Sequence, residues 1–310
     1  MSNAKMKAAF CTNYGEPEVL KIVLTDKPIP REDEVLIRIH ASAVNSADVR
    51  VRGLDVEGFM KIVMRFVLGF TKPRKPILGT TFAGVISEIG KNVTKFKKGD
   101  EVFGMTGFKF GTHAEYIALK ETDVIVNKPK NASFEEASAI IFGGSTAYHF
   151  LMKADIEKKS KMKILIYGAT GAVGTSAVQI AKYFNSDVTA VCSDEGKELV
   201  TSLSADDVII YSKEDFTKNG KRYDLIFDAI GKLNRKMVKS SLTERGIFST
   251  VGGFEVASET TTQLLFLKDL FDKNKLKAVI DKIYSLDDII EAHRYVDTKR
   301  KKGNVVIKVV

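Results

Sequence analysis

A glycine-rich turn between an apolar run and a helical pattern constrains the fold of this 310-residue chain more than any other feature. Residues 163–167 (KILIY) are largely apolar, as expected of a strand buried on both faces of a parallel sheet. Gly168, Gly171 and Gly174 follow with the spacing G-x-x-G-x-x-G, and apolar residues then recur at helical intervals. Such a turn lets backbone amides approach a pyrophosphate. An ordinary glycine-rich turn is the alternative, and we interpret the segment as a dinucleotide-binding unit.

The first part of the chain, residues 1–130, reads as many short strands. Residues 35–43 (VLIRIHASA) alternate between apolar and polar positions, which predicts a strand with one buried face. Further strands are predicted between turn residues at 82–90, 101–103 and 114–118. We therefore expect a β-rich domain here.

Strand and helix signals alternate over residues 131–275. An S-x-x-E capping box at Ser133 predicts a helix to about residue 142, and a second helix is predicted from Thr146 to about residue 152. Strands alternating with helices indicate βαβ units, so the fold class is α/β with a doubly wound parallel sheet. The strands are predicted at 163–167, 187–192, 207–211, 223–227 and 246–251.

A third pattern covers residues 276–310. It predicts a strand at 279–284, a helix capped by Ser285, and a last strand at 304–310.

Composition narrows the partners. The net charge of +9 comes mainly from scattered lysines, which attract anions such as a phosphorylated cofactor. The sequence contains no recognised nucleic-acid-binding motif, so we expect no specific nucleic-acid partner. Two distant cysteines, Cys11 and Cys192, fit a reducing compartment and argue against disulfides. The longest apolar stretch, residues 59–70, is interrupted by Lys61 and Arg65 and is too short to span a bilayer. We expect a cytoplasmic protein without a membrane partner.

Several segments together resemble the medium-chain dehydrogenase/reductase superfamily, and within it the zinc-independent quinone oxidoreductase branch. The resemblance runs through nearly the whole chain. Its segments are ASAVNSADVRVRG from Ala41, ILGTTFAGVISEIGKNVTKFKKGDEVFG from Ile77, GTHAEYIAL from Gly111, GATGAVGTSAVQIAK from Gly168, VTAVCS from Val188, and GNVVIKV near the C-terminus.

This resemblance implies a GroES-like domain over residues 1–130, a Rossmann NADP-binding domain over 131–275, and a C-terminal segment that returns to the first domain. The active site is then expected between the domains. Asn45 and Asp48 are implied as catalytic residues beside the nicotinamide, and Thr146 as a carboxamide contact; each also fits a turn or cap role. The remaining cofactor-binding positions implied are Gly168, Thr170, Gly171, Ala172, Val173, Gly174, Ser193, Lys197, Tyr211, Ile230, Val251, Gly252 and Gly253.

The end of the second predicted strand bears on cofactor choice. NAD-specific units carry an acidic residue there, and Cys192 occupies that position here. By resemblance, Ser193, Lys197 and Tyr211 surround a 2′-phosphate. Asp194 and Glu195 count against this arrangement unless they point to solvent. The sequence therefore predicts that NADPH is preferred.

A metal site is not expected. The loop Val44-Asn45-Ser46 lacks the cysteine of zinc-dependent relatives, and their four-cysteine lobe is missing. The four histidines, His40, His113, His149 and His293, are dispersed along the chain.

The chain also departs from the branch it resembles. The loop at residues 78–82 lacks the usual acidic residue, and residues 254–267 replace a longer span that often builds a dimer, so a homodimer is left open.

Three functions are compatible with these features. The first is an NADPH-dependent reductase of quinones or α,β-unsaturated carbonyl compounds, because direct hydride transfer to an electrophilic carbon needs no metal. The second is a zinc-independent alcohol or enoyl-thioester reductase, and the third is a non-catalytic NADPH-binding sensor. Residues 59–70 either cover the substrate cleft or pack on their own domain.

Overall fold

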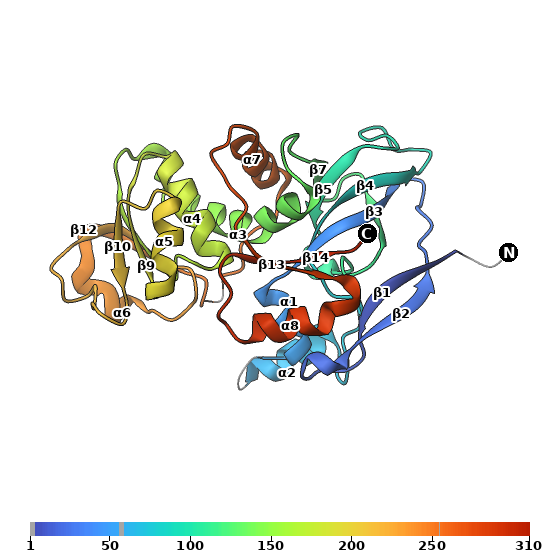
Figure 1. The fold of residues 1–310 in the computed structure, drawn as a ribbon, viewed down its shortest axis with the longest axis horizontal. Coiled ribbons are helices and arrows are strands. Elements are labelled where there is room, and N and C mark those ends of the chain that lie inside the picture. The colour runs from blue at the N-terminus through green and yellow to red at the C-terminus, as the bar shows by residue number, and fades with distance from the viewer. Residues whose placement is uncertain (1–3, 56–58, 254) are drawn as a thin grey trace. The chain divides into compact units, whose positions relative to one another are not determined.

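The computed structural model describes residues 4–55, 59–253 and 255–310. The chain forms two compact units, and the division between them falls inside two helices, α3 (Phe134–Lys153) and α7 (Thr261–Asp272) (Figure 1). Unit 1 contains the described residues of Met1–Ile141, Thr260–Lys268 and Ile280–Val310, and unit 2 those of Phe142–Glu259 and Asp269–Val279.

Unit 1 is built on a seven-stranded sheet of mostly antiparallel strands. Its order is β13-β14-β3-β4-β5-β7, with β6 also paired to β3, while β1 and β2 form a separate antiparallel pair. The last strand, β14, pairs with β3 in antiparallel register, so the end of the chain completes a sheet begun near its start. The strands are β1 (Lys5–Cys11), β2 (Leu20–Asp26), β3 (Glu34–Val44), β4 (Thr81–Ile89), β5 (Glu101–Met105), β6 (Tyr116–Lys120), β7 (Ile125–Asn127), β13 (Ile280–Ser285) and β14 (Asn304–Lys308).

Alternation along β3 explains this unit's core. Val35, Ile37 and Ile39 are fully buried, and they pack with Phe82 and Ile86 of β4 in one apolar cluster. A second cluster forms where helices cover the sheet and includes buried residues of α1 and α8. The helices assigned wholly to this unit are α1 (Ser46–Gly53), α2 (Phe59–Leu68) and α8 (Ile289–Asp297).

Unit 2 is a parallel sheet of five described strands in the order β10-β9-β8-β11-β12. β9 and β10 lie on one side of β8, and β11 and β12 lie on the other, so the strand order switches sides between β8 and β11. In such sheets, ligands bind outside the carboxyl ends of the strands at this switch point. The elements are β8 (Lys163–Tyr167), α4 (Ala172–Tyr183), β9 (Asp187–Cys192), α5 (Lys197–Ser202), β10 (Asp207–Ile210), β11 (Tyr223–Asp228), α6 (Arg235–Val238) and β12 (Leu242–Thr250).

These two architectures confirm the predicted fold class, a GroES-like β-rich domain together with a Rossmann-like parallel sheet. Short 3-10 helices connect the elements at Pro17–Val19, Gly107–Lys109, Ile156–Lys158, Asp194–Gly196, Lys239–Ser241 and Leu286–Asp288. Among the described helices, none has both the length and the apolarity needed to cross a bilayer.

One prediction of secondary structure is wrong. The two helices expected at 133–142 and 146–152 are a single helix, α3, which continues through Gly143 and Gly144. A Cβ atom at Gly143 would lie 2.2 Å from the carbonyl oxygen of Ala172, so this glycine lets α3 pack directly against the start of α4. The stability gained from this packing exceeds the cost of about 1 kcal/mol of a glycine inside a helix.

Candidate functional site

The predicted site loop of unit 1 lies at the start of α1. Asn45 is the N-cap, and its side-chain oxygen accepts hydrogen bonds from the backbone N–H groups of Ala47 at 2.8 Å and Asp48 at 3.3 Å. Its side-chain amide donates to the hydroxyl of Thr80 at 2.8 Å. The amide of Asn45 is therefore fixed from both ends, and its side chain is almost fully buried.

Asp48 completes the capping box. One carboxylate oxygen accepts from the backbone N–H of Asn45 at 2.9 Å, and the other accepts from Gly79 N–H at 3.0 Å. Burial raises the pKa of Asp48 to about 7, and the two backbone hydrogen bonds only partly offset that effect. Because this carboxyl group has no exposed surface, the structure favours a positioning role for it over direct contact with a substrate.

The loop that faces Asn45 lacks the acidic residue expected from the resemblance, and Thr80 makes the contact there. Gly79 has a φ of +88°, and a Cβ atom would lie 2.3 Å from the hydroxyl oxygen of Thr112. Only glycine fits this position without displacement of the backbone. No local pattern assigned a specific role to Thr80, because its partner lies 35 residues earlier.

The predicted cofactor residues of unit 2 gather at one edge of its sheet. Gly168 follows β8, Ser193 follows β9, Tyr211 follows β10, Ile230 comes shortly after β11, and Val251 follows β12. The strands are all parallel, so these residues share the carboxyl edge where dinucleotides bind.

The three glycines of the β8–α4 turn differ in the space around them. A Cβ atom at Gly174 would lie 2.2 Å from the carbonyl oxygen of Gly168, and one at Gly168 would lie 2.5 Å from Ile230. At Gly171 the nearest heavy atom would be 3.8 Å away, which is ordinary contact. Packing within the protein therefore requires Gly168 and Gly174, whereas Gly171 leaves a space that a ligand can occupy.

The start of α4 offers donors beside this space. Gly171 is the N-cap and provides no side-chain cap, so no side chain satisfies the first N–H groups of the helix there. Those groups belong to the turn that also contains Thr170, Ala172 and Val173. The N–H groups at the start of a helix, together with its dipole, favour a phosphate at this position.

A set of side chains surrounds the end of β9. Ser193 is half-buried, while Lys197 and Tyr211 are exposed, and Tyr211 N–H donates to the carbonyl of Cys192 at 3.1 Å. Asp194 forms an ion pair with Lys213 at 2.7 Å, which lowers the pKa of Asp194. The sequence analysis did not identify Lys213, although its position three residues after β10 could have indicated that it lies at this edge of the sheet.

The turn after β11 is organised by a fully buried carboxylate. Asp228 accepts backbone hydrogen bonds from Ile230, Gly231 and Leu233, at 3.2, 2.9 and 2.7 Å, and a fourth from the Thr250 hydroxyl at 3.0 Å. A Cβ atom at Gly231 would lie 2.8 Å from the Cα atom of Gly252, so the turns after β11 and β12 touch. Gly252 and Gly253 are exposed beside them.

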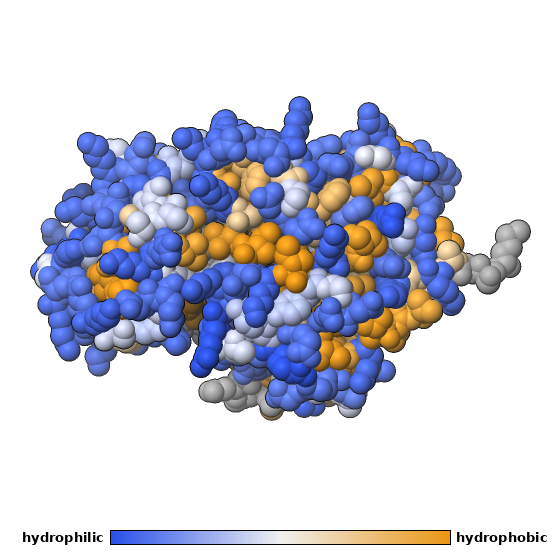
Figure 2. Space-filling view, viewed as in Figure 1, coloured by the Kyte–Doolittle hydropathy of each residue, from blue (hydrophilic) through white to orange (hydrophobic). Residues whose placement is uncertain are grey.

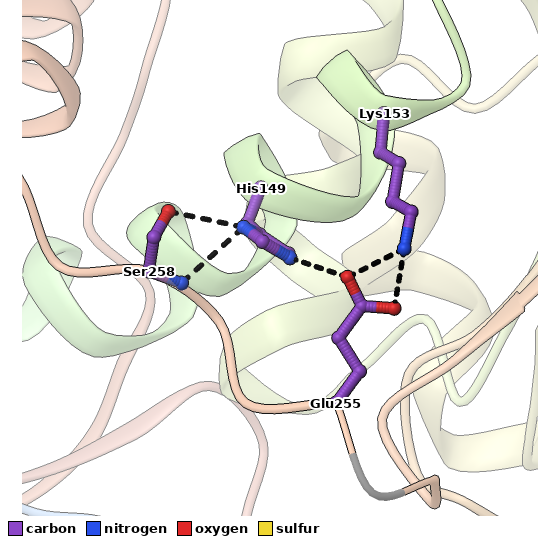
Figure 3. Close-up of polar contacts among 4 residues, drawn as sticks. All are labelled: His149, Lys153, Glu255 and Ser258. Atoms are coloured by element: carbon purple, nitrogen blue, oxygen red, sulfur yellow. Dashed lines mark hydrogen bonds and ion pairs between the residues drawn. The ribbon is translucent and has the colours of Figure 1, made fainter.

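Side chains of α3 hold the segment that follows these glycines. Nδ1 of His149 accepts from Ser258 N–H at 3.2 Å and lies 3.0 Å from its hydroxyl, while Nε2 lies 2.9 Å from Glu255 (Figure 3). Lys153 forms an ion pair with Glu255 at 2.6 Å. We call these four residues the α3 latch. Thr146 lies one turn before His149, and its hydroxyl donates to the Phe142 carbonyl at 2.8 Å.

Comparison with known proteins agrees with this description. Residues 31–130 match the alcohol dehydrogenase GroES-like domain, and residues 243–307 match the zinc-binding dehydrogenase family. The names of its curated relatives support an oxidoreductase. The chain belongs to the medium-chain dehydrogenase/reductase superfamily.

Its relatives include enzymes named for carbon–carbon double bonds and quinones. The chain is 35% identical to the 2-methylene-furan-3-one reductase of Solanum lycopersicum, over 98% of this chain and 79% of that protein. It is 31% identical to the chloroplastic NADPH-dependent alkenal/one oxidoreductase of Arabidopsis thaliana, over 98% and 79% of the two chains. The quinone oxidoreductase of Coxiella burnetii has a similar structure, with a TM-score of 0.83, 25% identity, and coverage of 99% of this chain and 100% of that one.

The residues do not fit the zinc ion that one family description implies. No group of three or more His, Cys, Asp or Glu side chains suited to a metal occurs within residues 4–55, 59–253 and 255–310. Both cysteines are buried, one in each unit. The histidines are engaged separately: His40 stacks on Phe134, His113 and His293 are buried, and His149 belongs to the α3 latch.

Proposed function

We propose that this protein is an NADPH-dependent reductase that transfers hydride to a quinone or an α,β-unsaturated carbonyl compound. The observation that carries the proposal is the open, uncapped turn at Gly171, because its glycine is not required by packing within the protein. A position of this kind suits the close approach of a pyrophosphate.

Basic residues support the choice of NADPH over NADH. Lys197 and Lys213 both lie near Asp194, where their charges lower its pKa, and Ser193 precedes it. The Lys197 ammonium and the Ser193 hydroxyl suit a 2′-phosphate. The ion pair with Lys213 also answers the objection that Asp194 would repel the phosphate, since its charge is already compensated.

The chain's own residues then bind and orient the reactants. Bound NADPH would supply the hydride. Ile230, Val251, Gly252 and Gly253 would support the nicotinamide half, and Thr146 its carboxamide. On the acceptor side, Asn45, held in place by Asp48 and Thr80, would fix the shape of the loop beside the substrate.

The choice of acceptor follows from the absence of fit to zinc and from the relatives. A quinone or enone moves the incoming charge onto its own oxygen, so orientation and exclusion of water are the protein's main tasks. The names of the tomato and Arabidopsis relatives, which refer to a furanone and to alkenals and alkenones, favour this class.

The proposal is tested by following NADPH oxidation through its absorbance at 340 nm. The acceptors compared are quinones, alkenals, alkenones, ketones and enoyl thioesters. We expect turnover with the first three, retained in the presence of a chelator. Turnover restricted to ketones or thioesters would support the second function considered above. Tight NADPH binding without turnover of any acceptor would support the sensor.

Cofactor preference is tested with Lys197→Ala. Loss of a charge-assisted contact costs about 1.5–3 kcal/mol, so the Kd for NADPH should rise by about tenfold or more while the Kd for NADH changes little. Lys158→Ala is the matched control, because that lysine precedes β8 and pairs with Asp155. Equal or tighter binding of NADH by the unsubstituted protein would refute the cofactor assignment.

A further inference from the structure

Helix α2 carries apolar side chains on two opposite sides. Met64 packs against the core of unit 1, and Leu68 is buried. Ile62, Phe66 and Val67 are instead 53%, 59% and 57% exposed. At about 100° per residue, these three occupy one sector of roughly 140° on the helix surface. A helix that is apolar on its outer side as well needs a partner there.

The exposed face continues beyond the end of the helix. Phe70 is 52% exposed, and its ring meets that of Phe66 edge-on at 4.8 Å between centroids. We call Ile62, Phe66, Val67 and Phe70 the α2 face. The four side chains form a contiguous apolar surface within two and a half helical turns, by the period of about 3.6 residues per turn.

Positive charge lies beside one end of the α2 face. From residue 59 to residue 87 the sequence contains no Asp or Glu. Lys72, Arg74 and Lys75 are exposed, and no ion pair to any of them occurs among the residues that the structure describes. Arg65 lies on α2 itself and donates to the carbonyl of Phe70 at 2.6 Å.

A pocket of about 420 Å³ adjoins the α2 face and combines the same two chemistries. Phe10, Phe70 and Pro73 contribute apolar walls, whereas Lys72 and Arg74 contribute cationic groups. Apolar walls beside two cations are complementary to an amphiphile with a negatively charged head group. A zwitterionic or cationic partner lacks this complementarity.

The apolar patch on the β1–β2 hairpin differs, because most of the lysines around it are paired with carboxylates. Figure 2 shows apolar side chains gathered near the β1–β2 hairpin, and Leu24 of β2 is 71% exposed. Lys7, which lies opposite Leu24 on β1, pairs with Asp287, and Lys5 pairs with Asp26. Exposed apolar side chains are common on proteins, so it is the combination with unopposed positive charge that distinguishes the α2 face from the hairpin.

We propose that the α2 face binds the surface of a bilayer that contains anionic phospholipids. The helix would lie in the interface, with its apolar side chains among the upper acyl chains and Lys72, Arg74 and Lys75 at the head groups. This replaces the expectation of no membrane partner, which rested on the length needed to span a bilayer; a helix in the interface needs no such length. The inference is independent of the proposed function, because vesicle binding is measured without cofactor or acceptor.

Flotation of the full chain with phospholipid vesicles tests the proposal. We expect binding to phosphatidylcholine vesicles that contain about one-third phosphatidylglycerol, weakening as salt is raised, and little binding to phosphatidylcholine alone. The double variant F66S/F70S should reduce the bound fraction about tenfold, and K72E/R74E should do the same. Circular dichroism and thermal unfolding would establish that each variant is folded, which the exposure of these side chains favours.

Two control variants change similar side chains elsewhere in unit 1. Leu24→Ser removes an exposed apolar side chain of β2, and K21E/K98E reverses two exposed lysines. Both should bind anionic vesicles as the unsubstituted protein does. If K21E/K98E reduced binding as much as K72E/R74E, net charge rather than the α2 face would explain the interaction, and the proposal would be overturned.

Other occupants of the α2 face give different results. If the face joins two copies of the chain, F66S/F70S would convert a dimer to a monomer in gel filtration, with no vesicle binding before or after. If it covers a substrate site, the same variant would raise the KM for the acceptor, again without vesicle binding. Either result overturns the proposal, as does vesicle binding that F66S/F70S leaves unchanged.

Discussion

The loops that carry the predicted site are packed very differently in the two units. In unit 1 the loop around Asp48 is closed: its carboxyl group is fully buried, and a Cβ atom at Gly79 would lie 2.3 Å from Thr112. In unit 2 the turn at Gly171 is open, with the nearest heavy atom 3.8 Å from a Cβ atom built there. A closed loop fixes the orientation of a side chain such as Asn45, whereas an open turn presents backbone N–H groups to a ligand.

A buried aspartate organises a loop in each unit, but to a different extent. Asp48 accepts two backbone hydrogen bonds, and Asp228 accepts three from the backbone and one from Thr250. Asp228 therefore accepts twice as many hydrogen bonds as Asp48, although its donors are only partly buried. The comparison implies that the unit 2 turn depends more strongly on its aspartate.

The largest effect is expected for Asp228→Ala. A hydrogen bond to a charged group contributes about 1.5–3 kcal/mol and four are lost here, so the free energy of unfolding should fall by roughly 3 kcal/mol or more. Urea unfolding monitored by circular dichroism measures the change, and Asp48→Ala is the matched variant in unit 1. A larger loss for Asp48→Ala than for Asp228→Ala would contradict the comparison.

Gly79→Ala tests how closed the unit 1 loop is. The added methyl group would meet Thr112 and His113, and the φ of +88° is unfavourable for any residue with a Cβ atom. Strain and overpacking together should lower the free energy of unfolding by about 2–3 kcal/mol. A loss below about 0.5 kcal/mol would mean that the loop can relax, and that the contrast with unit 2 is overstated.

Gly171→Ala tests how open the unit 2 turn is. Its φ of −76° and the free space predict an unchanged melting temperature, whereas the Kd for NADPH should rise about tenfold because the methyl group occupies the ligand's space. Gly174→Ala is the contrasting variant, because its methyl group would lie 2.2 Å from the carbonyl of Gly168 and should lower the melting temperature. Calorimetry and cofactor titration separate the two effects. Unchanged NADPH binding by Gly171→Ala would show that the pyrophosphate lies elsewhere.

The smallest effect is a pH dependence in unit 1. Burial raises the folded-state pKa of Asp48 from 3.8 to about 7, so the folded state holds this proton more tightly than the unfolded state does. Its contribution to stability is complete below pH 4 and is lost as the pH rises to about 7. The stability advantage of the unsubstituted protein over Asp48→Asn should therefore shrink by at least about 1 kcal/mol across this range, as measured by urea unfolding. A constant difference would indicate that Asp48 has an ordinary pKa.

Several strands of both units were predictable because their signals are local. The period-two alternation at 35–43 and the apolar run at 163–167 correspond to β3 and β8, and the glycine spacing located the β8–α4 turn. Each pattern reflects neighbouring residues in one element. The continuity of α3 was not predictable, since it depends on the contact between Gly143 and α4.

Contacts between distant segments account for the features that were missed. Glu255 and His149 of the α3 latch are separated by 106 residues, and Lys213 lies 19 residues from its partner Asp194. No periodicity in the sequence relates such positions. Their proximity follows from strand order, which brings the ends of β9 and β10 together and places the segment after β12 against α3.

The spacing of the two glycines at the start of α4 has a consequence for how this protein tolerates mutation. Gly171 and Gly174 lie three residues apart, yet only Gly174 is required by the packing of the fold. A screen for soluble expression would therefore remove substitutions at Gly174 and retain those at Gly171. Selection for folding and selection for ligand binding act on different residues within a single helical turn, so a library could lose cofactor binding at Gly171 without any loss of yield.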